Sequence, residues 1–541
     1  MTTSPPLPEA AGRAIGSEAS LRLLAQLVSI APTNLEDVGH GRWEKPNYLR
    51  AADALVRAAR DAGLSTRVYD PMVAGDVEGD WHGAPRPNVI AELDRGARET
   101  VLILAHFDVV PVPAEQLSRW KSPPHTLTHR SDGRLYGRGA NDDLGSGIVS
   151  SMAALTRLAA DPNLSKNVRL IACCDEETGG EGGVEAIKAH DARLSPEDPE
   201  RILRGDVALI PDGSPEATGG SSGVAFLDAS FSGPTELKDV LAYGEALVDL
   251  HEVVRRWRSA YASPDWPNRH APEPVITGRA SVTCFDVSDV PSTERGVRLV
   301  AAHAETDAAN QIPAAVTLLF RGDPAELQTL PSRLAPLVVA PFRLAPAGAS
   351  ALAVPNGTLA LQLIGQAAHG GSPHLGHNPV PATLRLLRAA IERGVVDGRA
   401  KGIATFTVDM RIIPEMELSA ALDEALHYVR SFISNRSPTA LISAPPARCR
   451  AGYALPVDHP ALLRLERILH DTLGASGVHG EYGGTDASAL RDLLTPKGEP
   501  LPALVFGSMD PESHIHDAEE SADPRKIAAI AESIVRFVRE P

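Results

Sequence analysis

The feature that most constrains the fold is a regular alternation of short apolar runs and helical patterns in the first part of the chain. Four runs are rich in aliphatic residues and end near acids, glycine or proline: residues 87–93, 99–110, 167–176 and 206–213. Apolar residues recur at helical spacing in three further segments: 18–30, 47–64 and 145–160. Strands that alternate with helices predict an α/β domain with a mostly parallel sheet between helices. Such sheets bind ligands beyond the carboxyl ends of their strands.

Length, charge and cysteine usage narrow the class of protein. A chain of 541 residues exceeds one hydrophobic core, so we expect two or more domains. A net charge of −17 argues against a nucleic-acid partner, since such proteins usually present a basic surface. No apolar run approaches the roughly 18 residues of a membrane span, and no secretory signal is visible at the N-terminus. The four cysteines show no CxxC spacing. We therefore expect a soluble, cytoplasmic protein without a membrane partner.

Polar residues follow the predicted strands at even intervals. The steps from His106 to Asp142, then to Glu177, then to Asp212 are 36, 35 and 35 residues, about one strand–helix unit each. Near the C-terminus another apolar run leads to two histidines, His514 and His516. Imidazole and carboxylate groups without cysteine suit Zn²⁺, Mn²⁺ or Co²⁺, and the excess of carboxylates favours two ions. Bound cations would also explain the adjacent acids at 175–177, which are costly without positive charge.

Six motifs in this order resemble one known family. They are "HFDVVP", "LYGRGANDDLGSG", "CDEETGG", "PDGSP", "GQAAHGGSPHLGHNP" and "HIHDAEES". Together they are similar to the dinuclear zinc aminopeptidase-like family. That family includes acetylornithine deacetylase, succinyl-diaminopimelate desuccinylase, glutamate carboxypeptidase, carnosinase and related bacterial dipeptidases. The resemblance covers residues 20–535 and so nearly the whole chain.

The resemblance implies a role for each motif residue. His106 and Asp212 would hold one ion, Glu177 and His516 the other, and Asp142 would bridge them. Asp108 would orient the His106 imidazole, and Glu176 would act as the general base on a water molecule. His514 is a rival for His516, but Glu520 stands four residues after His516, where the family has an acid. Asp143 is expected to be a structural acid at a helix start.

The middle of the chain lacks metal-type strand ends and is predicted to be an inserted lid domain. The catalytic domain would consist of residues 1–222 and 446–541, with an α+β, ferredoxin-like lid at 223–445 between them. A strand–helix–strand pattern is predicted to occur twice in this lid, at about 223–330 and 356–445. The alternative is a single elongated lid whose halves look alike only through shared periodicity.

The lid is expected to contribute residues to the site. In monomeric dipeptidases of the family a second lid half replaces a partner subunit, so a monomer is favoured here and a homodimer is the alternative. By resemblance, His369 would stabilise the oxyanion, while Asn310 would contact the substrate. Arg411 would bind a substrate carboxylate, although an ordinary ion pair is the alternative. Gly484 would let backbone approach the substrate, and a plain tight turn is almost as good an explanation.

These observations favour a metal-dependent hydrolase of small amide substrates. A dipeptidase or carboxypeptidase is preferred, and an N-acyl-amino-acid deacylase is the alternative within the family. A non-catalytic binding protein on the same scaffold is less favoured, because every expected catalytic and metal-ligand position is filled.

Overall fold

The computed structural model forms two compact units. It describes residues 15–33, 36–37, 43–44, 47–75, 84–112, 114–262, 275–289, 296–305, 311–347, 357–369, 373, 376–436, 439–445 and 448–540. Unit 1 comprises residues 1–220, 454–479 and 485–541, and unit 2 comprises residues 221–453 and 480–484. The lid predicted at 223–445 falls within unit 2. In the described part of the chain, no helix is both long and apolar enough to cross a membrane.

Unit 1 is built on a sheet whose central strands are parallel. The strand order is β10–β27–β9–β5–β8–β4–β3. Neighbours within the group β27, β9, β5 and β8 run parallel, whereas β10, β4 and β3 join antiparallel at the two sides. The bounds are β3 (Ser65–Tyr69), β4 (Asn88–Leu93), β5 (Thr100–His106), β8 (Asn167–Cys173), β9 (Val207–Ile210), β10 (Ala217–Ser221) and β27 (Ala503–Val505). The predicted α/β class is confirmed.

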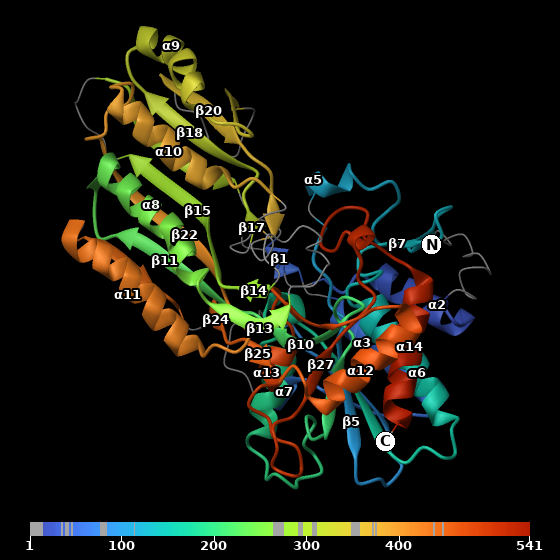
Figure 1. Ribbon diagram of the computed structural model, residues 1–541. Helices are drawn as coiled ribbons and strands as arrows, with labels where there is room; N and C mark the ends of the chain where they lie inside the picture. The colour runs from blue at the N-terminus through green and yellow to red at the C-terminus, as the bar shows by residue number, and fades with distance from the viewer. Residues whose placement is uncertain are drawn as a thin grey trace. The chain divides into compact units, whose positions relative to one another are not determined.

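Helices cover the central strands. In Figure 1, α6 (Ser150–Ala159), α12 (Pro460–Leu473) and α14 (Pro524–Arg539) lie on one side of β5, and α7 (Val184–Asp191) lies on the other. α14 packs against both α6 and α12. Its apolar residues recur every three or four positions, which places Ile527, Ile530, Ile534 and Phe537 in the core.

The remaining elements of unit 1 are helices at the start of the chain and several short segments. α2 (Glu18–Ile30) packs against α3 (Tyr48–Asp61), and α13 (Ala487–Leu490) packs against α7. β6 (Thr128–His129), β7 (Leu135–Tyr136) and β28 (Ser521–Ala522) form a small sheet. β1 (Glu36–Asp37) pairs with β2 (Trp43–Glu44). The short helices are α4 (Pro71–Ala74) and α5 (Ala114–Leu117).

Unit 2 contains the ferredoxin-like arrangement that the sequence predicted. In chain order its elements are β11 (Gly223–Phe231), α8 (Leu237–Val254), β15 (Arg279–Asp289), β22 (Lys401–Ile412), α11 (Leu418–Arg436) and β23 (Ala440–Ser443). These strands lie in the order β23–β11–β22–β15 and are antiparallel. This is the order of a βαββαβ unit.

The chain between β15 and β22 extends the same sheet. It adds the order β16–β18–β20–β19 beyond β15, with α9 (Pro324–Leu334) and α10 (Pro379–Glu392). The added strands are β16 (Arg298–Glu305), β18 (Ala315–Arg321), β19 (Arg343–Pro346) and β20 (Thr358–Ile364). The two sequence halves predicted at 223–330 and 356–445 therefore interleave, because β22 of the second half lies between β11 and β15 of the first. Neither half closes a ferredoxin-like unit by itself.

The sheet of unit 2 has one face covered by helices. α8 contacts α10 and α11, and these three helices lie together against the sheet in Figure 1. Along β11 the buried side chains alternate with half-buried ones, as a strand with one covered face requires.

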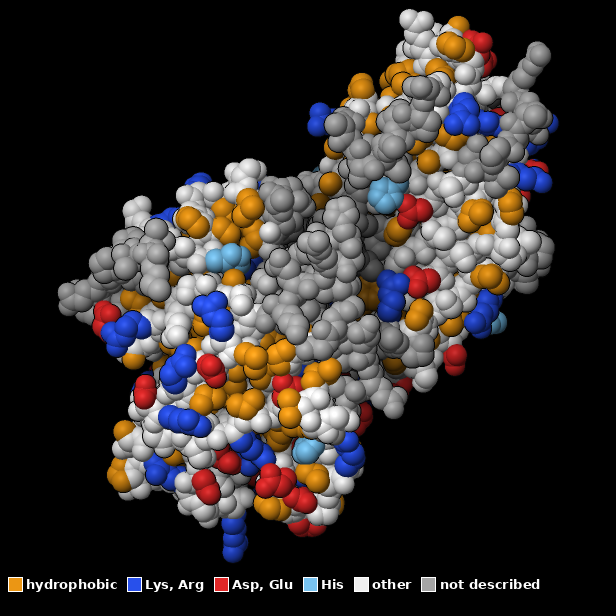
Figure 2. Space-filling view, turned by 180° about the vertical axis from the view of Figure 1, so that it is seen from behind, with side chains coloured by type: hydrophobic (Ala, Val, Ile, Leu, Met, Phe, Trp, Pro, Cys, Tyr) orange, Lys and Arg blue, Asp and Glu red, His pale blue; other side chains and the backbone are white. Residues whose placement is uncertain are grey.

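Seen from behind, the described surface of the molecule carries basic and acidic side chains interspersed among apolar ones (Figure 2).

The remaining strands of unit 2 are short. β13 (Arg258–Ala262) pairs with β14 (Val275–Thr277), and β17 (Gln311–Ile312) pairs with β21 (Ala368–His369). β12 (Thr235–Glu236) joins β22, and β24 (Cys449–Arg450) joins β11. Two short strands lie near the junctions between the units in sequence: β25 (Tyr453–Ala454) and β26 (Val478–Glu481).

Candidate metal centre and active site

Three neighbouring parallel strands of unit 1 carry predicted site residues at one edge of the sheet. His106 is the last residue of β5, Asp212 follows β9, and Glu177 follows β8 in the short helix η2 (Glu176–Thr178). β5 pairs with both β8 and β9 in parallel. Their carboxyl ends therefore meet at the same edge, which is where open α/β sheets bind ligands.

Asp142 lies between the two histidines of the predicted site. Its Oδ1 is 3.2 Å from His106 Nε2, and its Oδ2 is 2.9 Å from His516 Nε2. The side chain is almost completely buried. One carboxylate with each oxygen facing a different imidazole has the arrangement of a bridging ligand.

The other two predicted ligands complete the cluster. Glu177 Oε1 is 3.1 Å from His516 Nε2, and Asp212 Oδ2 is 3.9 Å from His106 Nε2. Among the described residues, two groups have ligand atoms within 4.8 Å of one another and so could hold a metal ion: His106 with Asp142 and Glu177, and His106 with Asp143 and Asp212. The structure thus brings all five predicted ligands together.

Of the two candidate histidines, His516 faces the cluster. His516 Nε2 lies 2.9 Å from Asp142 Oδ2 and 3.1 Å from Glu177 Oε1, although both His514 and His516 are exposed and neither belongs to the two groups named above. Both residues have positive φ angles, 49° at His514 and 64° at His516. The backbone is therefore in the left-handed conformation at both histidines of the loop that brings His516 next to Asp142.

Asp143 lies closer to the chemistry than the sequence suggested. It does precede a helix, η1 (Leu144–Val149), as expected, but its side chain makes no capping hydrogen bond. Its Oδ2 instead accepts a hydrogen bond from the His106 backbone N–H at 3.3 Å. Its Oδ1 is buried without a hydrogen-bond partner among the described residues. Asp143 can therefore serve as a further donor to a cation beside His106 and Asp212.

The electrostatics of the cluster indicate a shortage of positive charge. Burial raises the pKa of Glu176, helped by the charges of Asp486 and Asp212. Burial also raises the pKa of Asp212, to about 8, even though His106 opposes the shift. For Asp142, burial acts to raise the pKa, but contacts with His106 and His516 outweigh it and lower the pKa. Carboxylates that hold protons for lack of partners fit a site made for divalent cations.

Asp108 connects the first ligand to the turn that carries the base. Its Oδ1 lies 3.4 Å from His106 Nδ1, and its backbone carbonyl lies 3.0 Å from the same nitrogen. The two carboxylate oxygens accept the backbone N–H groups of Glu176 and Glu177 at 3.1 and 3.2 Å. The hydrogen bond of the His106 ring thus goes to the backbone carbonyl of Asp108, with the carboxylate 3.4 Å away. No pattern in the sequence predicted that the Asp108 carboxylate also accepts the backbone N–H groups of Glu176 and Glu177.

The first acid of the "DEE" block is neutralised by protein groups. Asp175 is buried, accepts a hydrogen bond from Tyr48 Oη at 2.9 Å and forms an ion pair with the buried Arg86. Burial raises the pKa of Asp175 to about 6, although Arg86 opposes the shift. The three consecutive acids thus divide their tasks. Asp175 anchors the turn from behind, and Glu176 and Glu177 remain available for the site.

Residues expected from the lid belong to unit 2. Asn310 lies outside the described residues, and His369 is described only through its backbone, in β21 opposite Gln311. Arg411 is buried, and its Nε and Nη2 donate to Asp409 at 2.7 and 2.8 Å. This is the ion pair that the sequence analysis kept as an alternative. Gly484 is exposed, and a side chain added there would meet nothing within 4 Å.

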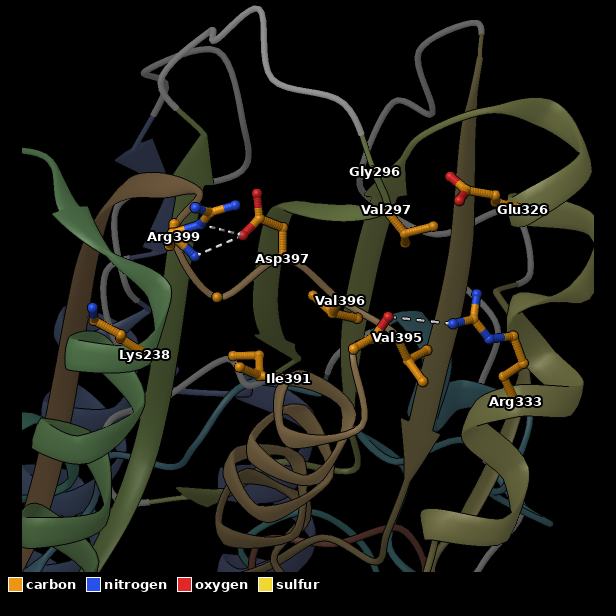
Figure 3. A pocket seen from close by; sticks show the side chains of 12 residues that line it. Lys238, Gly296, Val297, Glu326, Arg333, Ile391, Val395, Val396, Asp397 and Arg399 are labelled. Carbon is orange, nitrogen blue, oxygen red and sulfur yellow. Dashed lines mark hydrogen bonds and ion pairs between the residues drawn. The ribbon is translucent and has the colours of Figure 1, made fainter.

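A pocket of about 380 Å³ in unit 2 is separate from these residues (Figure 3). Two of its charged lining groups pair with each other, Arg399 with Asp397, and Arg333 donates to the carbonyl of Gly394. None of the predicted site residues lines it. The candidate site is therefore the cluster at the strand ends of unit 1.

Comparison with known proteins supports this interpretation. Residues 102–540 match the sequence model of Peptidase family M20/M25/M40. An uncharacterized metallohydrolase of Methanocaldococcus jannaschii is 28% identical over 198 residues, 36% of this chain and 44% of that protein. The Cys-Gly metallodipeptidase of Schizosaccharomyces pombe is 29% identical over 197 residues, 35% and 39% of the two chains. A succinyl-diaminopimelate desuccinylase of Acidovorax ebreus is 42% identical over 105 residues, 18% and 26%. Each match spans less than half of the relative's length.

The fold is shared over a much longer stretch. The solved structure of the dipeptidase Dug1p from Saccharomyces cerevisiae has a TM-score of 0.56 at 12% identity. The likeness covers 98% of this chain and 97% of that chain. At this identity the likeness concerns the fold alone.

Proposed function

Because the chain belongs to Peptidase family M20/M25/M40, we propose that it is a metal-dependent hydrolase that cleaves an amide bond in a dipeptide or other small peptide. The observation that carries this proposal is the position of Asp142, whose two carboxylate oxygens face His106 and His516. That bridge, with Glu177 and Asp212 beside it, suits two divalent ions. A binding protein would not need a general base next to such a site.

The donor set assigns the ions to residues. His106 and Asp212 would hold one ion, with Asp143 as a further donor, and Glu177 and His516 would hold the other. Neutral imidazoles and several carboxylates favour Zn²⁺, with Mn²⁺ and Co²⁺ as alternatives. When bound, the ions would act as Lewis acids and lower the pKa of a nearby water molecule.

The chain's own residues would then move the proton and orient the site. Glu176 would take the proton of the attacking water, since its neighbour Glu177 is directed to His516. Asp108 would hold both the His106 ring and the backbone of the 176–177 turn, so that ligand and base keep a fixed spacing. His369 would stabilise the negative oxygen of the substrate carbonyl, a task worth about 3–4 kcal/mol per donor.

Substrate recognition is assigned to the lid. We place Arg411 at the substrate carboxylate, with Asp409 holding its guanidinium in a fixed orientation. Asn310 and Gly484 are proposed to contact the rest of the substrate. We also propose a monomer, in which the segment between β15 and β22 replaces the lid of a partner subunit. A cytoplasmic location fits the four free thiols.

A second candidate, an N-acyl-amino-acid deacylase, has one observation in its favour. The desuccinylase of Acidovorax ebreus has the higher identity, 42%, but over only 105 residues. The peptidase is preferred because the match with the Cys-Gly metallodipeptidase spans 197 residues, against 105 for the desuccinylase.

The test is an activity screen of the zinc- or manganese-loaded protein. Dipeptides, C-terminally extended peptides and N-acyl amino acids are offered in parallel, and release of free amino acid is measured. We expect turnover of dipeptides that is lost with a chelator and restored by metal. Turnover confined to N-acyl amino acids would favour the deacylase. No turnover of any amide by a protein that binds metal would contradict the proposal.

The role of His369 and the monomer are tested together by mixing Glu176→Gln protein with His369→Ala protein. In a self-contained monomer every chain carries one defect, so no activity is recovered. In a dimer that exchanges histidines, mixed dimers would contain one intact site. Recovered activity with a dimeric mass in solution would contradict the monomer.

A further inference from the structure

Glu520 is a buried acid that touches no predicted metal ligand side chain and yet connects the loops of two of them. It follows His516 by four residues, and only 1% of its side chain is exposed. One carboxylate oxygen, Oε2, accepts Arg138 Nη1 at 2.6 Å. The other, Oε1, accepts the backbone N–H groups of Asn141 and Asp142, both at 3.3 Å. Both oxygens are therefore used, each in a different direction.

The same loops are connected by three further hydrogen bonds. The backbone carbonyl of Glu520 accepts the N–H of Gly137 at 3.0 Å, at the start of the loop that ends in Asp142. Arg138 Nη2 donates to Gln116 Oε1 at 3.4 Å, and Gln116 Nε2 donates to the backbone carbonyl of His516 at 3.5 Å. The Arg138–Glu520 pair thus contacts the backbone of Asp142 directly and that of His516 through Gln116.

We propose that Glu520 is a positioning residue that sets the affinity of the metal centre by fixing the Asp142 loop against the loop of His516. The inference rests on the proposed metal site. Asp142 must present one oxygen to each histidine, so a small rotation of its loop misplaces both contacts at once. Groups that orient metal ligands in this way typically change metal affinity or activity by about 10–100-fold when altered.

The chain offers a matched pair of variants. Glu520→Gln keeps the size of the side chain but leaves one acceptor oxygen, so its NH₂ group must face either Arg138 or the N–H groups of Asn141 and Asp142. Glu519→Gln changes the neighbouring acid of the same loop. Glu519 pairs with Arg130 and accepts the backbone N–H of Lys121, at 3.0 and 2.7 Å, and these partners lie outside the Asp142 loop.

The experiment is a zinc titration of the metal-free full chain, by calorimetry or against a chromophoric chelator, with thermal unfolding of each metal-free variant as the check on folding. We expect zinc affinity to fall about 10–100-fold in Glu520→Gln and to stay at the wild-type value in Glu519→Gln. In turnover, kcat of Glu520→Gln at limiting zinc should fall, and saturating zinc should restore most of it at unchanged KM.

Gln116→Ala serves as a second variant on a half-buried side chain, for the case that Glu520→Gln does not fold. It should lower zinc affinity a few-fold by releasing the His516 carbonyl. Wild-type zinc affinity in the folded variants would overturn the proposal, as would an equal loss in Glu519→Gln, which would indicate a general loss of stability. A wild-type chain that binds no zinc would instead contradict the metal centre itself.

Discussion

The two units treat their charged side chains in opposite ways. In unit 2, three described pairs of buried or half-buried side chains join an acid to a basic group: Arg411 with Asp409, Arg448 with Asp228 and His303 with Asp286. In unit 1, Asp142, Asp143, Glu176, Glu177 and Asp212 gather around two histidines. Protein cations do reach nearby acids, as Arg86 reaches Asp175 and Arg138 reaches Glu520. Among the described residues, the strand ends of unit 1 keep an excess of negative charge that these ion pairs of unit 2 lack, and this excess indicates where a cation is needed.

The largest expected effect comes from the base in unit 1. Glu176→Gln retains the shape of the side chain and removes the proton acceptor, so kcat should fall by about 10²–10⁴-fold. Zinc content should stay at the wild-type value, since Glu176 is not assigned to an ion. Steady-state kinetics and metal analysis of the same preparation measure both. A variant that retains most of its turnover would show that another group activates the water.

A charge of unit 2 should matter more to stability than to chemistry. Arg411→Met leaves Asp409 buried without its partner, so the free energy of unfolding should fall by about 3–5 kcal/mol. Denaturant unfolding measures this effect.

Arg411→Lys keeps the charge but loses the two parallel N–H donors of the guanidinium group, and it separates the two roles of Arg411. If Arg411 also binds a substrate carboxylate, KM should rise for a dipeptide with a free C-terminus and stay the same for its amide. Equal KM changes for both substrates would leave Arg411 with the ion pair alone.

A smaller effect is expected when Asp108 no longer connects His106 to the 176–177 turn. Asp108→Asn keeps only one acceptor for the two N–H groups that the carboxylate now receives. Zinc affinity or kcat/KM should fall by about 10–100-fold. Zinc titration separates these two losses. If both affinity and kcat/KM were unchanged, the turn would hold its geometry without Asp108.

The smallest expected effect comes from an ion pair of unit 1, Glu519 with Arg130, in which each charge has a partner of opposite sign as in the pairs of unit 2. The Arg130 side chain holds the pKa of Glu519 at about 2, although burial opposes the shift. A lowered pKa means that the stabilisation is complete above the unfolded value, near 4.5, and is lost as the pH falls from there towards 2. Glu519→Gln should therefore lower the free energy of unfolding by about 1–2 kcal/mol at pH 7, and the difference should shrink below pH 4.5. A difference that does not change with pH between 7 and 3 would contradict this pair.

The sequence predicted which candidate ligands lie together better than it predicted the residues that hold them in place. His106, Glu177 and Asp212 could be placed together because they follow parallel strands, whose carboxyl ends share an edge. Asp142 and His516 came from motif resemblance, and the geometry places both beside these residues. Arg86, Tyr48 and the tie made by Glu520 had no local signal. Each acts across more than eighty residues of chain, and only the folded structure brings such partners together.

The lid shows the same limit on prediction. Helix and strand patterns predicted the ferredoxin-like elements, but the order of strands depends on pairing between distant segments. β22 inserts between β11 and β15, about 120–180 residues away in the chain, and periodicity alone contains no information about that choice. The sequence could therefore indicate two similar halves without showing that they interleave in one sheet.

If the strand ends of unit 1 form a site for two divalent ions, the number of ions bound per chain must show it. Metal-free protein is titrated with zinc, and bound metal per chain is measured by calorimetry and elemental analysis, with Asp142→Asn as the comparison. We predict two ions for each wild-type chain and at most one for the variant, which lacks the bridge. A wild-type chain that takes up no zinc at saturation, or a variant that still binds two ions with unchanged affinity, would contradict the two-ion site.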